Sequence, residues 1–131
     1  MILLDTDVLI EILEKRSQKG EELYSTLIEV GESVCTTSIN LHELLYGLKK
    51  YNKSTKTLLQ FPVLEYSKDD AQVSSEIECH LEKKGNPVRR IDTMIAAIAI
   101  NKTVSLLTLD KRHYAAIADK FPLKLYQSGK K

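Results

Sequence analysis

The sequence predicts an α/β domain with a largely parallel sheet, and three observations support this fold class. Short runs of apolar or β-branched residues alternate with longer segments whose apolar residues recur at helical spacing. The clearest run, Ile2–Leu4, has no polar alternation, which is typical of a strand buried on both faces of a parallel sheet. Two of the runs are closely followed by an aspartate, Asp5 and Asp110. In open α/β folds, this carboxyl edge of the sheet is where ligands bind.

The elements follow from their local patterns in chain order. Asp7 is a good N-cap for the first helix, Ser38 for the third, and Ser67 with Asp70 forms an approximate capping box for the fifth. The predicted strands are 2–4, 33–37, 63–66, 104–107 and 123–126, and the predicted helices begin after residue 7 and near residues 21, 38, 55, 67, 92 and 111. The pattern therefore predicts about five short strands and about six or seven helices, which cover both faces of the sheet.

Composition limits the class of protein. The 131 residues, 43% of them hydrophobic, predict a single domain over 1–131 with a core of its own. Cys35 lies in an apolar stretch and Cys79 on a polar helix, so both are expected to be reduced. The chain starts without a basic leader, and no apolar run reaches the roughly 20 residues that span a bilayer. We expect a soluble, cytoplasmic protein with no membrane partner.

Charge is balanced overall but locally concentrated. The net charge of +1 excludes a polycation that coats nucleic acid indiscriminately. Arg89 and Arg90 precede one aspartate of interest, and Lys111 and Arg112 follow another. Such basic pairs are usually solvated helix ends. Their position beside carboxylates favours a substrate that carries phosphate.

Three aspartates stand at points where a ligand could bind. Asp5 and Asp110 each follow a buried strand, and Asp92 heads the most apolar helix of the chain. Each also has a purely structural interpretation, because aspartate is a common turn residue and N-cap. Asp92 would in addition be held at the positive end of a buried helix, which keeps a carboxylate ionised and able to bind a cation.

Glu43 is the fourth acid. It falls nearly opposite the leucine stripe of its helix, where a solvated surface glutamate is the simplest interpretation. Gly47 shares that side, and glycine in a helix interior costs about 1 kcal/mol relative to alanine, so we expect another part of the molecule to approach this face. A set of carboxylates without histidine or thiolate suits Mg²⁺ or Mn²⁺, which activate water in phosphodiester cleavage.

Four stretches together resemble the PIN-domain nucleases, and in particular the VapC-type toxins of prokaryotic toxin–antitoxin pairs. They are Leu-Asp-Thr-Asp-Val-Leu-Ile at the start, Asn-Leu-His-Glu-Leu-Leu-Tyr-Gly, Arg-Ile-Asp-Thr-Met-Ile-Ala-Ala-Ile-Ala and Leu-Leu-Thr-Leu-Asp-Lys-Arg-His-Tyr, and they span nearly the whole chain. The resemblance implies a three-layer α/β/α domain and endonuclease action on RNA that depends on Mg²⁺ or Mn²⁺. It also implies frequent homodimers and inhibition by a small cognate antitoxin.

The same resemblance assigns roles to residues. Asp5 and Asp92 would be the principal metal ligands, Glu43 and Asp110 the remaining acids of the site, and Thr108 a supporting hydroxyl. Asp7 stands where the family often has asparagine or serine, so the resemblance leaves open whether Asp7 joins the site or caps the helix.

Two other functions fit parts of the sequence. Asp5-Thr-Asp-Val after an apolar strand also resembles the first motif of the haloacid-dehalogenase-like phosphatases, in which the first aspartate is the nucleophile. Leu9 stands where that pattern usually has threonine or valine, and no pair of neighbouring acids occurs around Asp110. The third possibility is a PIN-like scaffold that binds RNA or protein without cutting, against which the four acids argue.

Overall fold

Four parallel strands form the centre of the molecule. The computed structural model describes residues 1–127. The strands are β1 (Ile2–Leu4), β2 (Val34–Thr37), β3 (Val63–Leu64) and β4 (Ser105–Leu107), and their order in the sheet is β3-β2-β1-β4. The chain therefore leaves β1 towards β2 on one side and later returns to β4 on the other. The carboxyl end of β1 thus lies at a topological switch point of the sheet, where open α/β folds bind ligands.

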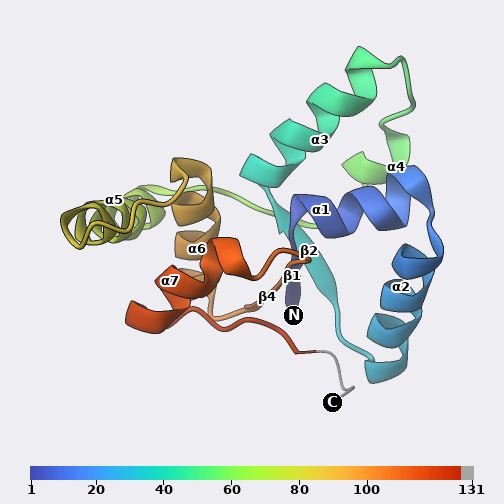
Figure 1. The fold of residues 1–131 in the computed structure, drawn as a ribbon. Helices are drawn as coiled ribbons and strands as arrows, with labels where there is room; N and C mark the ends of the chain where they lie inside the picture. Colours follow the sequence, from blue (N-terminus) through green and yellow to red (C-terminus); the bar gives the residue numbers. More distant parts are fainter. Residues whose placement is uncertain (128–131) are drawn as a thin grey trace.

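Each predicted helix is present. The helices are α1 (Thr6–Leu9), which continues into the π-helix η1 (Ile10–Lys15), α2 (Gln18–Val30), α3 (Ser38–Lys50), α4 (Lys56–Leu59), α5 (Lys68–Lys83), α6 (Arg90–Lys102) and α7 (Arg112–Lys120). Figure 1 shows their arrangement around the sheet. The longest described helix, α5, has 16 residues, and none of the described helices is long and apolar enough to cross a bilayer.

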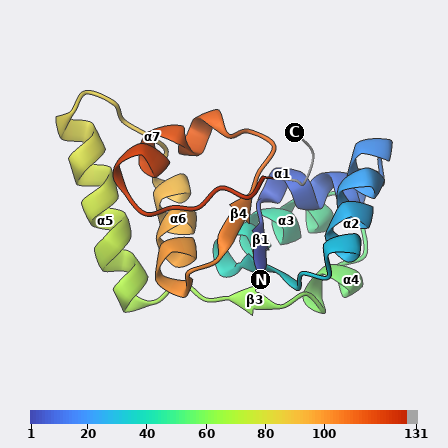
Figure 2. The same cartoon turned by 90° about the horizontal axis from the view of Figure 1, so that it is seen from below.

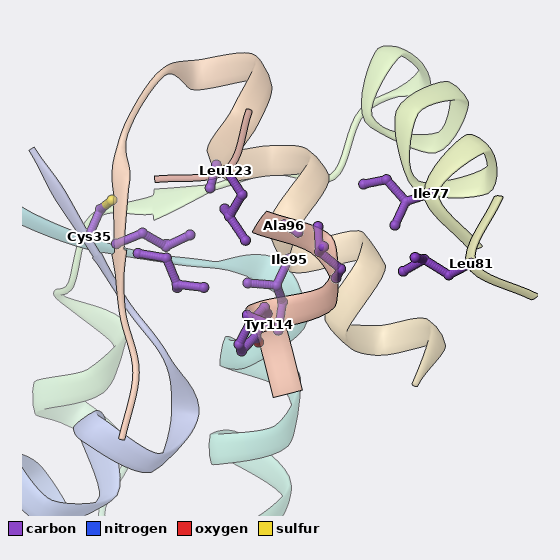
Figure 3. Packing of buried hydrophobic residues seen from close by; sticks show 11 residues of the cluster. Cys35, Ile77, Leu81, Ile95, Ala96, Tyr114 and Leu123 are labelled. Carbon is purple, nitrogen blue, oxygen red and sulfur yellow. The ribbon is translucent and has the colours of Figure 1, made fainter. Parts of the chain in front are cut away.

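The helices form one layer on each face of the sheet, as predicted. Figure 2 shows α5, α6 and α7 on one side of β1 and β4, with α1 and α2 on the other. The side chains of β1 alternate accordingly: Leu3 packs with α5–α7, whereas Ile2 and Leu4 pack with α1–α4. Figure 3 shows the first of these two clusters, in which Ile95 and Ala96 of α6 lie between the sheet and α5. All three β1 side chains are buried, which confirms the prediction of a strand covered on both faces.

The prediction of a fifth strand is wrong. Within 123–126 only Leu125 pairs with the sheet, through an isolated parallel bridge to Leu106. The bridge consists of hydrogen bonds from Leu106 N to Lys124 O and from Tyr126 N to Leu106 O, both 2.8 Å. The apolar pattern of this segment reflects burial of Leu123 against the core rather than membership of the sheet.

The N-caps of α1 and α3 lie two residues and one residue before the predicted ones. Asp5, not Asp7, is the N-cap of α1, and its carboxylate accepts a hydrogen bond from Thr6 N. Thr37, not Ser38, is the N-cap of α3, and its hydroxyl accepts from Asn40 N. In both cases the strand passes directly into the helix without a separate turn. The N-cap of α1 is therefore the residue immediately after β1, and the N-cap of α3 is the last residue of β2.

Asp92 is not an N-cap either. Helix α6 begins at Arg90, with Arg89 in extended conformation at the N-cap and without a side-chain capping bond. Asp92 lies in the first turn, where an acid still interacts favourably with the positive end of the helix. Its carboxylate is bound to the Arg89 side chain instead of to free backbone N–H groups.

The two cysteines are free, and they differ in exposure as predicted. Cys35 is fully buried and donates to Ile2 O, whereas Cys79 is exposed. Burial raises the pKa of the Cys35 thiol to about 11. Because the thiolate is the reactive form, we expect a disulfide reagent such as DTNB at pH 8 to modify one thiol per folded chain rapidly and both in denaturant. Cys79→Ser should remove the rapid reaction; rapid modification of two thiols in the folded wild type would contradict this assignment.

Candidate active site

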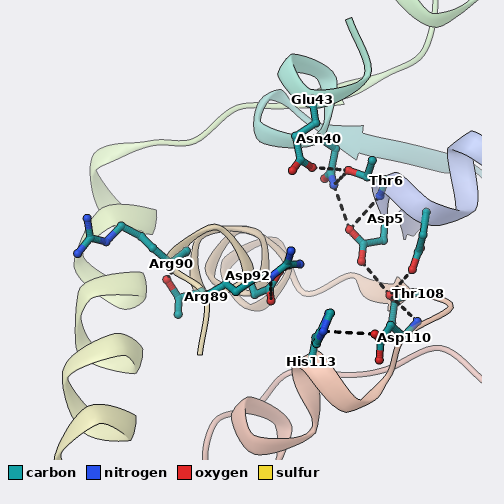
Figure 4. Close-up of polar contacts among 12 residues, drawn as sticks. Asp5, Thr6, Asn40, Glu43, Arg89, Arg90, Asp92, Thr108, Asp110 and His113 are labelled. Carbon is teal, nitrogen blue, oxygen red and sulfur yellow. Dashed lines mark hydrogen bonds and ion pairs between the residues drawn. The ribbon is translucent and has the colours of Figure 1, made fainter. Parts of the chain in front are cut away.

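The predicted acids lie in one cleft at the carboxyl edge of the sheet. The cleft has a volume of about 250 Å³, and Figure 4 shows the side chains around it. We call it the acidic cleft, and its charged and titratable lining residues are Asp5, Asp7, Glu43, Asp92, Asp110, Arg89 and His113. The acids come from the end of β1, from α1, α3 and α6, and from the segment after β4. Tertiary folding therefore brings together residues that are up to about a hundred positions apart in the chain.

Asp5 lies at the end of β1, and protein donors hold both of its carboxylate oxygens. Oδ1 accepts from Thr6 N (2.9 Å) and Asn40 Nδ2 (3.1 Å), and Oδ2 accepts from the Thr108 hydroxyl (2.8 Å). The Asp5 residue is 8% exposed. Hydrogen bonds from three neutral donors fix the orientation of this buried carboxylate. Thr108 thus lies beside Asp5 and donates to its carboxylate.

Asn40 is a buried hub that we did not predict as a site residue. Its Nδ2 donates to Asp5 and to the Thr6 hydroxyl (2.8 Å), and its Oδ1 accepts from the Thr37 hydroxyl (2.7 Å). The Thr6 hydroxyl in turn donates to Glu43 Oε1 (2.6 Å). One hydrogen-bond chain therefore connects two acids of the cleft through Asn40 and Thr6. The available signal was the helical spacing that places Asn40 on the same side of α3 as Glu43.

Glu43 faces the cleft and is half-buried, so the interpretation as a fully solvated surface acid is wrong. The expectation attached to Gly47 is also wrong. A Cβ built on Gly47 would meet no atom within 4 Å, so no part of the described chain closely approaches this position. The structure gives no packing reason for a glycine there.

Asp7 joins the cleft and does not cap α1. Its carboxylate accepts from Leu109 N (3.2 and 3.3 Å) and from the Thr108 hydroxyl (3.4 Å), which ties α1 to the segment after β4. Burial and the neighbouring charge of Asp5 raise the pKa of Asp7, although these hydrogen bonds partly offset the effect. The acidic cleft therefore carries unfavourable carboxylate repulsion in the metal-free protein.

Asp92 is almost completely buried and forms a two-point ion pair with Arg89. Arg89 Nε donates to Oδ2 (2.9 Å) and Arg89 Nη2 to Oδ1 (2.8 Å). The hydrogen bond with Asp92 raises the pKa of Arg89. The exposed fraction is 2% for the Asp92 side chain and 65% for that of Arg89. A buried acid is thus neutralised by a cation that reaches in from the surface.

Asp110 lies at the rim of the cleft, where its side chain is 34% exposed. Its carboxylate is 3.3 Å from His113 Nε2 and 3.7 Å from Arg112 Nε. Its backbone N–H donates to the Thr108 hydroxyl, so Thr108 contacts Asp5, Asp7 and Asp110. His113 is a cleft residue that we did not predict. The only sequence signal was its position three residues after Asp110.

The four predicted RNA-binding residues have different surroundings. Arg89 lines the cleft, and Arg112 lies beside Asp110. Lys111 is exposed and donates to Gln127. Arg90 points away from the cleft (Figure 4) and forms an ion pair with Glu78 of α5. The structure therefore does not bring Arg90 to the acidic cleft.

Tyr114 of α7 lies near the cleft from the core side. The residue is 1% exposed, and its hydroxyl has no hydrogen-bond partner within residues 1–127. Burial, followed by the charges of Asp5 and Asp92, raises its pKa. The phenol therefore stays neutral. The sequence did not indicate that Tyr114 lies near the cleft, because an aromatic residue in the apolar stripe of a helix is usually an ordinary core residue.

The donor set fits a hard divalent cation. All five acids supply oxygen, which Mg²⁺ and Mn²⁺ prefer, and no cysteine lines the cleft. Within the described part of the chain, however, no three acidic, histidine or cysteine side chains are close enough to hold one ion together. Protein donors hold the carboxylates of Asp5, Glu43 and Asp92 instead. The oxygen donors of the cleft suit Mg²⁺ or Mn²⁺, but in this conformation they accept hydrogen bonds from other protein groups.

Comparison with known families agrees with this geometry. The sequence matches the PIN domain over residues 2–120. The chain belongs to the PIN domain family. It is 27% identical over 122 residues to the tRNA(fMet)-specific endonuclease VapC of Salmonella typhimurium, covering 88% of this chain and 90% of that protein. It is 25% identical to the enzyme of the same name from Shigella flexneri, with the same coverage.

Two solved structures contain chains that share the fold of this PIN domain. The structure of VapBC2 from Rickettsia felis bound to a promoter DNA fragment contains a chain with a TM-score of 0.77 and 23% identity, covering 96% of this chain and 98% of that one. FitAcB from Neisseria gonorrhoeae contains one with a TM-score of 0.76 and 22% identity, covering 98% of both chains. The predicted three-layer PIN-like fold is confirmed.

Proposed function

We propose that this PIN domain is the toxin of a VapBC-type pair and hydrolyses RNA phosphodiesters in a reaction that depends on Mg²⁺ or Mn²⁺. The observation that carries the proposal is the convergence of acids from separate elements on one cleft at the switch point of the sheet. The VapC endonucleases similar to this chain over most of its length support the reaction class. We extend to this chain the substrate class, RNA, and not the particular tRNA in their names.

In this proposal Asp5 and Asp92 are the principal metal ligands, and Glu43 and Asp110 complete the acidic set. A bound Mg²⁺ or Mn²⁺ would supply an activated water and neutralise charge on the phosphate. Thr108 and Asn40 hold the Asp5 carboxylate in one orientation. Asp7 adds negative charge beside Asp5 and strengthens the attraction of the cleft for a cation.

The basic residues around the cleft would bind the backbone of the RNA. Arg89, Lys111 and Arg112 are exposed near its rim, where guanidinium and ammonium groups can pair with phosphates. Without cations, the carboxylates of the cleft would repel the substrate. Arg90 is not part of this surface, because it pairs with Glu78 on the side facing α5.

The phosphatase alternative is disfavoured because the sequence matches the PIN domain over residues 2–120, that is, over nearly the whole chain. The second acid of the phosphatase motif, Asp7, is bound to Leu109 N. A non-catalytic scaffold would have no need to keep buried, mutually repelling acids, which cost stability.

The proposal includes partners and a location. A VapB-like antitoxin is expected because toxin–antitoxin complexes are among the proteins that share this fold. A homodimer is also expected, since Tyr24, Ile28 and Val30 of α2 leave large apolar side chains exposed. An RNA substrate and an antitoxin would both place the protein in the cytoplasm.

Metal dependence is the direct test. The purified protein should cleave a mixed RNA substrate with Mg²⁺ or Mn²⁺ present, lose this activity in EDTA and regain it when Mg²⁺ is added in excess, which gel analysis of the products would measure. Hydrolysis of p-nitrophenyl phosphate should not be detectable. Undiminished RNA cleavage in EDTA would exclude the metal mechanism, and a trapped aspartyl-phosphate would favour the phosphatase.

A further inference from the structure

The ion pair between Arg89 and Asp92 occupies the atoms that the proposed function needs. Both carboxylate oxygens of Asp92 accept from the guanidinium, at 2.8 and 2.9 Å. The oxygens of a buried carboxylate with almost no solvent exposure have little room for a further cation. A divalent ion at Asp92 must therefore displace Arg89 from at least one of the two oxygens.

The geometry of Arg89 allows that displacement without disturbing the fold. Arg89 precedes the first residue of α6, and its side chain is 65% exposed. Within the described residues, Asp92 is its only hydrogen-bonded or ion-paired side-chain partner. Arg89 also lines the acidic cleft, and the charge of Glu43 contributes to its raised pKa, so it would remain near other acids after release.

The absence of a preformed metal site agrees with this geometry. No three metal-binding side chains within residues 1–127 converge on one point, although five acids line the cleft. Arg89 carries one of the charges that a cation would otherwise supply. In this structure, Arg89 of the same chain thus neutralises Asp92, the most buried acid of the cleft.

We infer that Arg89 is an internal competitor that holds Asp92 until a divalent ion displaces it, and that it thereby sets the metal concentration at which the cleft is loaded. The inference rests on the proposed metal-dependent function. Its physical basis is population shift: a ligand that binds only the open form has an apparent affinity reduced by the fraction of molecules that are open. A paired state favoured about tenfold over the open one lowers the apparent affinity about tenfold.

The test measures binding of Mn²⁺ to the full chain by isothermal titration calorimetry. Arg89→Gln removes the competitor, and we expect its Mn²⁺ affinity to be about tenfold higher than that of the wild type. Arg89→Lys keeps the charge but cannot form the planar two-point contact, so we expect a smaller increase of about threefold. Arg90→Gln is the matched control, because it removes an equal charge one residue away that pairs with Glu78 outside the cleft. Its affinity should stay within about twofold of the wild type.

Thermal unfolding gives a second readout that does not depend on catalysis. Without metal, Arg89→Gln should melt at a lower temperature than the wild type, because Asp92 is left buried and unpaired. Saturating Mn²⁺ should raise the melting temperature of Arg89→Gln by more than that of the wild type, because a ligand that binds more tightly stabilises the native state more.

The outcomes separate the inference from the proposed function. Equal Mn²⁺ affinity in the wild type and Arg89→Gln would overturn the competition while leaving metal binding intact. A tighter Arg89→Gln with an unchanged Arg89→Lys would also overturn it, since only the local charge would then matter. If neither the wild type nor Arg89→Gln bound Mn²⁺ at millimolar concentration, the proposed function would fail together with the inference.

Discussion

Asp92→Asn is expected to reduce RNA cleavage by about two orders of magnitude or more while leaving the fold intact. The substitution keeps the shape of the side chain and removes the negative charge of the most buried acid in the cleft. A site that holds a divalent cation loses affinity when it loses a ligand charge. Cleavage rates at several Mn²⁺ concentrations would measure both the loss and any partial recovery at high metal.

Asp92→Asn should also lower the stability of the metal-free protein. Asp92 is not the N-cap, so asparagine cannot substitute for it through capping, and the charged pair with Arg89 becomes a weaker hydrogen bond. A hydrogen bond between charged groups is worth about 1.5–3 kcal/mol, so a loss of about 1–2 kcal/mol is expected without metal. Part of this loss is offset because the acids of the cleft repel each other less.

Asp119→Asn is the matched control for Asp92→Asn. Asp119 is an exposed acid near the end of α7 whose only ion-pair partner within residues 1–127 is Lys120, and it does not line the cleft. Its cleavage rate and melting temperature should match those of the wild type. Wild-type cleavage by a preparation of Asp92→Asn that is free of contaminating ribonuclease would refute the proposed active site.

Asn40→Asp should be the most destabilising of the conservative changes around the cleft. The new side chain could no longer donate to Asp5 and the Thr6 hydroxyl, and it would place a second carboxylate where Nδ2 now lies, 3.1 Å from Asp5 Oδ1. Asn40 is fully buried, so water cannot screen the repulsion. We expect a loss of about 3 kcal/mol or more, measured by urea unfolding at pH 7 without metal.

The pH dependence of Asn40→Asp has a definite sign. Burial and the charge of Asp5 would raise the pKa of the introduced carboxyl in the folded state above its value in the unfolded state. Its destabilising effect is therefore complete at high pH and disappears as the pH falls towards the unfolded value of about 3.9. A protonated carboxyl is neutral and can donate to Asp5 as the amide does.

Asn101→Asp provides the comparison for the same chemical change. Asn101 is exposed and also donates to a buried carboxylate, Asp70 Oδ1, at 2.7 Å. The introduced group can turn towards water, so we expect a loss of about 1 kcal/mol. Equal losses at the two positions would show that burial of Asn40 is not the source of the effect.

Local sequence was sufficient where a residue's role depends on its immediate neighbours. The apolar run of β1 predicted a strand covered on both faces, and the position of Asp5 after it predicted an acid at the carboxyl edge. The capping box of Ser67 and Asp70 was also predicted and is present. The sequence signals for these features come from residues no more than a few positions apart.

Predictions failed where the sequence pattern did not show whether a segment joins the sheet or what a helix face contacts. The run 123–126 has the composition of a strand, yet only Leu125 pairs with its neighbour. Strand formation requires a partner along the whole run, which composition does not supply. The helix pattern correctly placed Glu43 on a side away from the leucines. It could not show that this side faces the cleft, where Glu43 accepts a hydrogen bond from the Thr6 hydroxyl.

The neighbouring arginines show most clearly what sequence determined and what only tertiary structure decided. Sequence alone established that Arg89 and Arg90 stand beside an acid at the start of an apolar helix. In the structure, Arg89 forms an ion pair with Asp92 in the cleft, and Arg90 forms one with Glu78 on α5. Successive residues at a helix start point about 100° apart, so they face different parts of the molecule. Which part each one meets depends on how α6 packs between α5 and the sheet, a long-range arrangement that the local pattern does not contain.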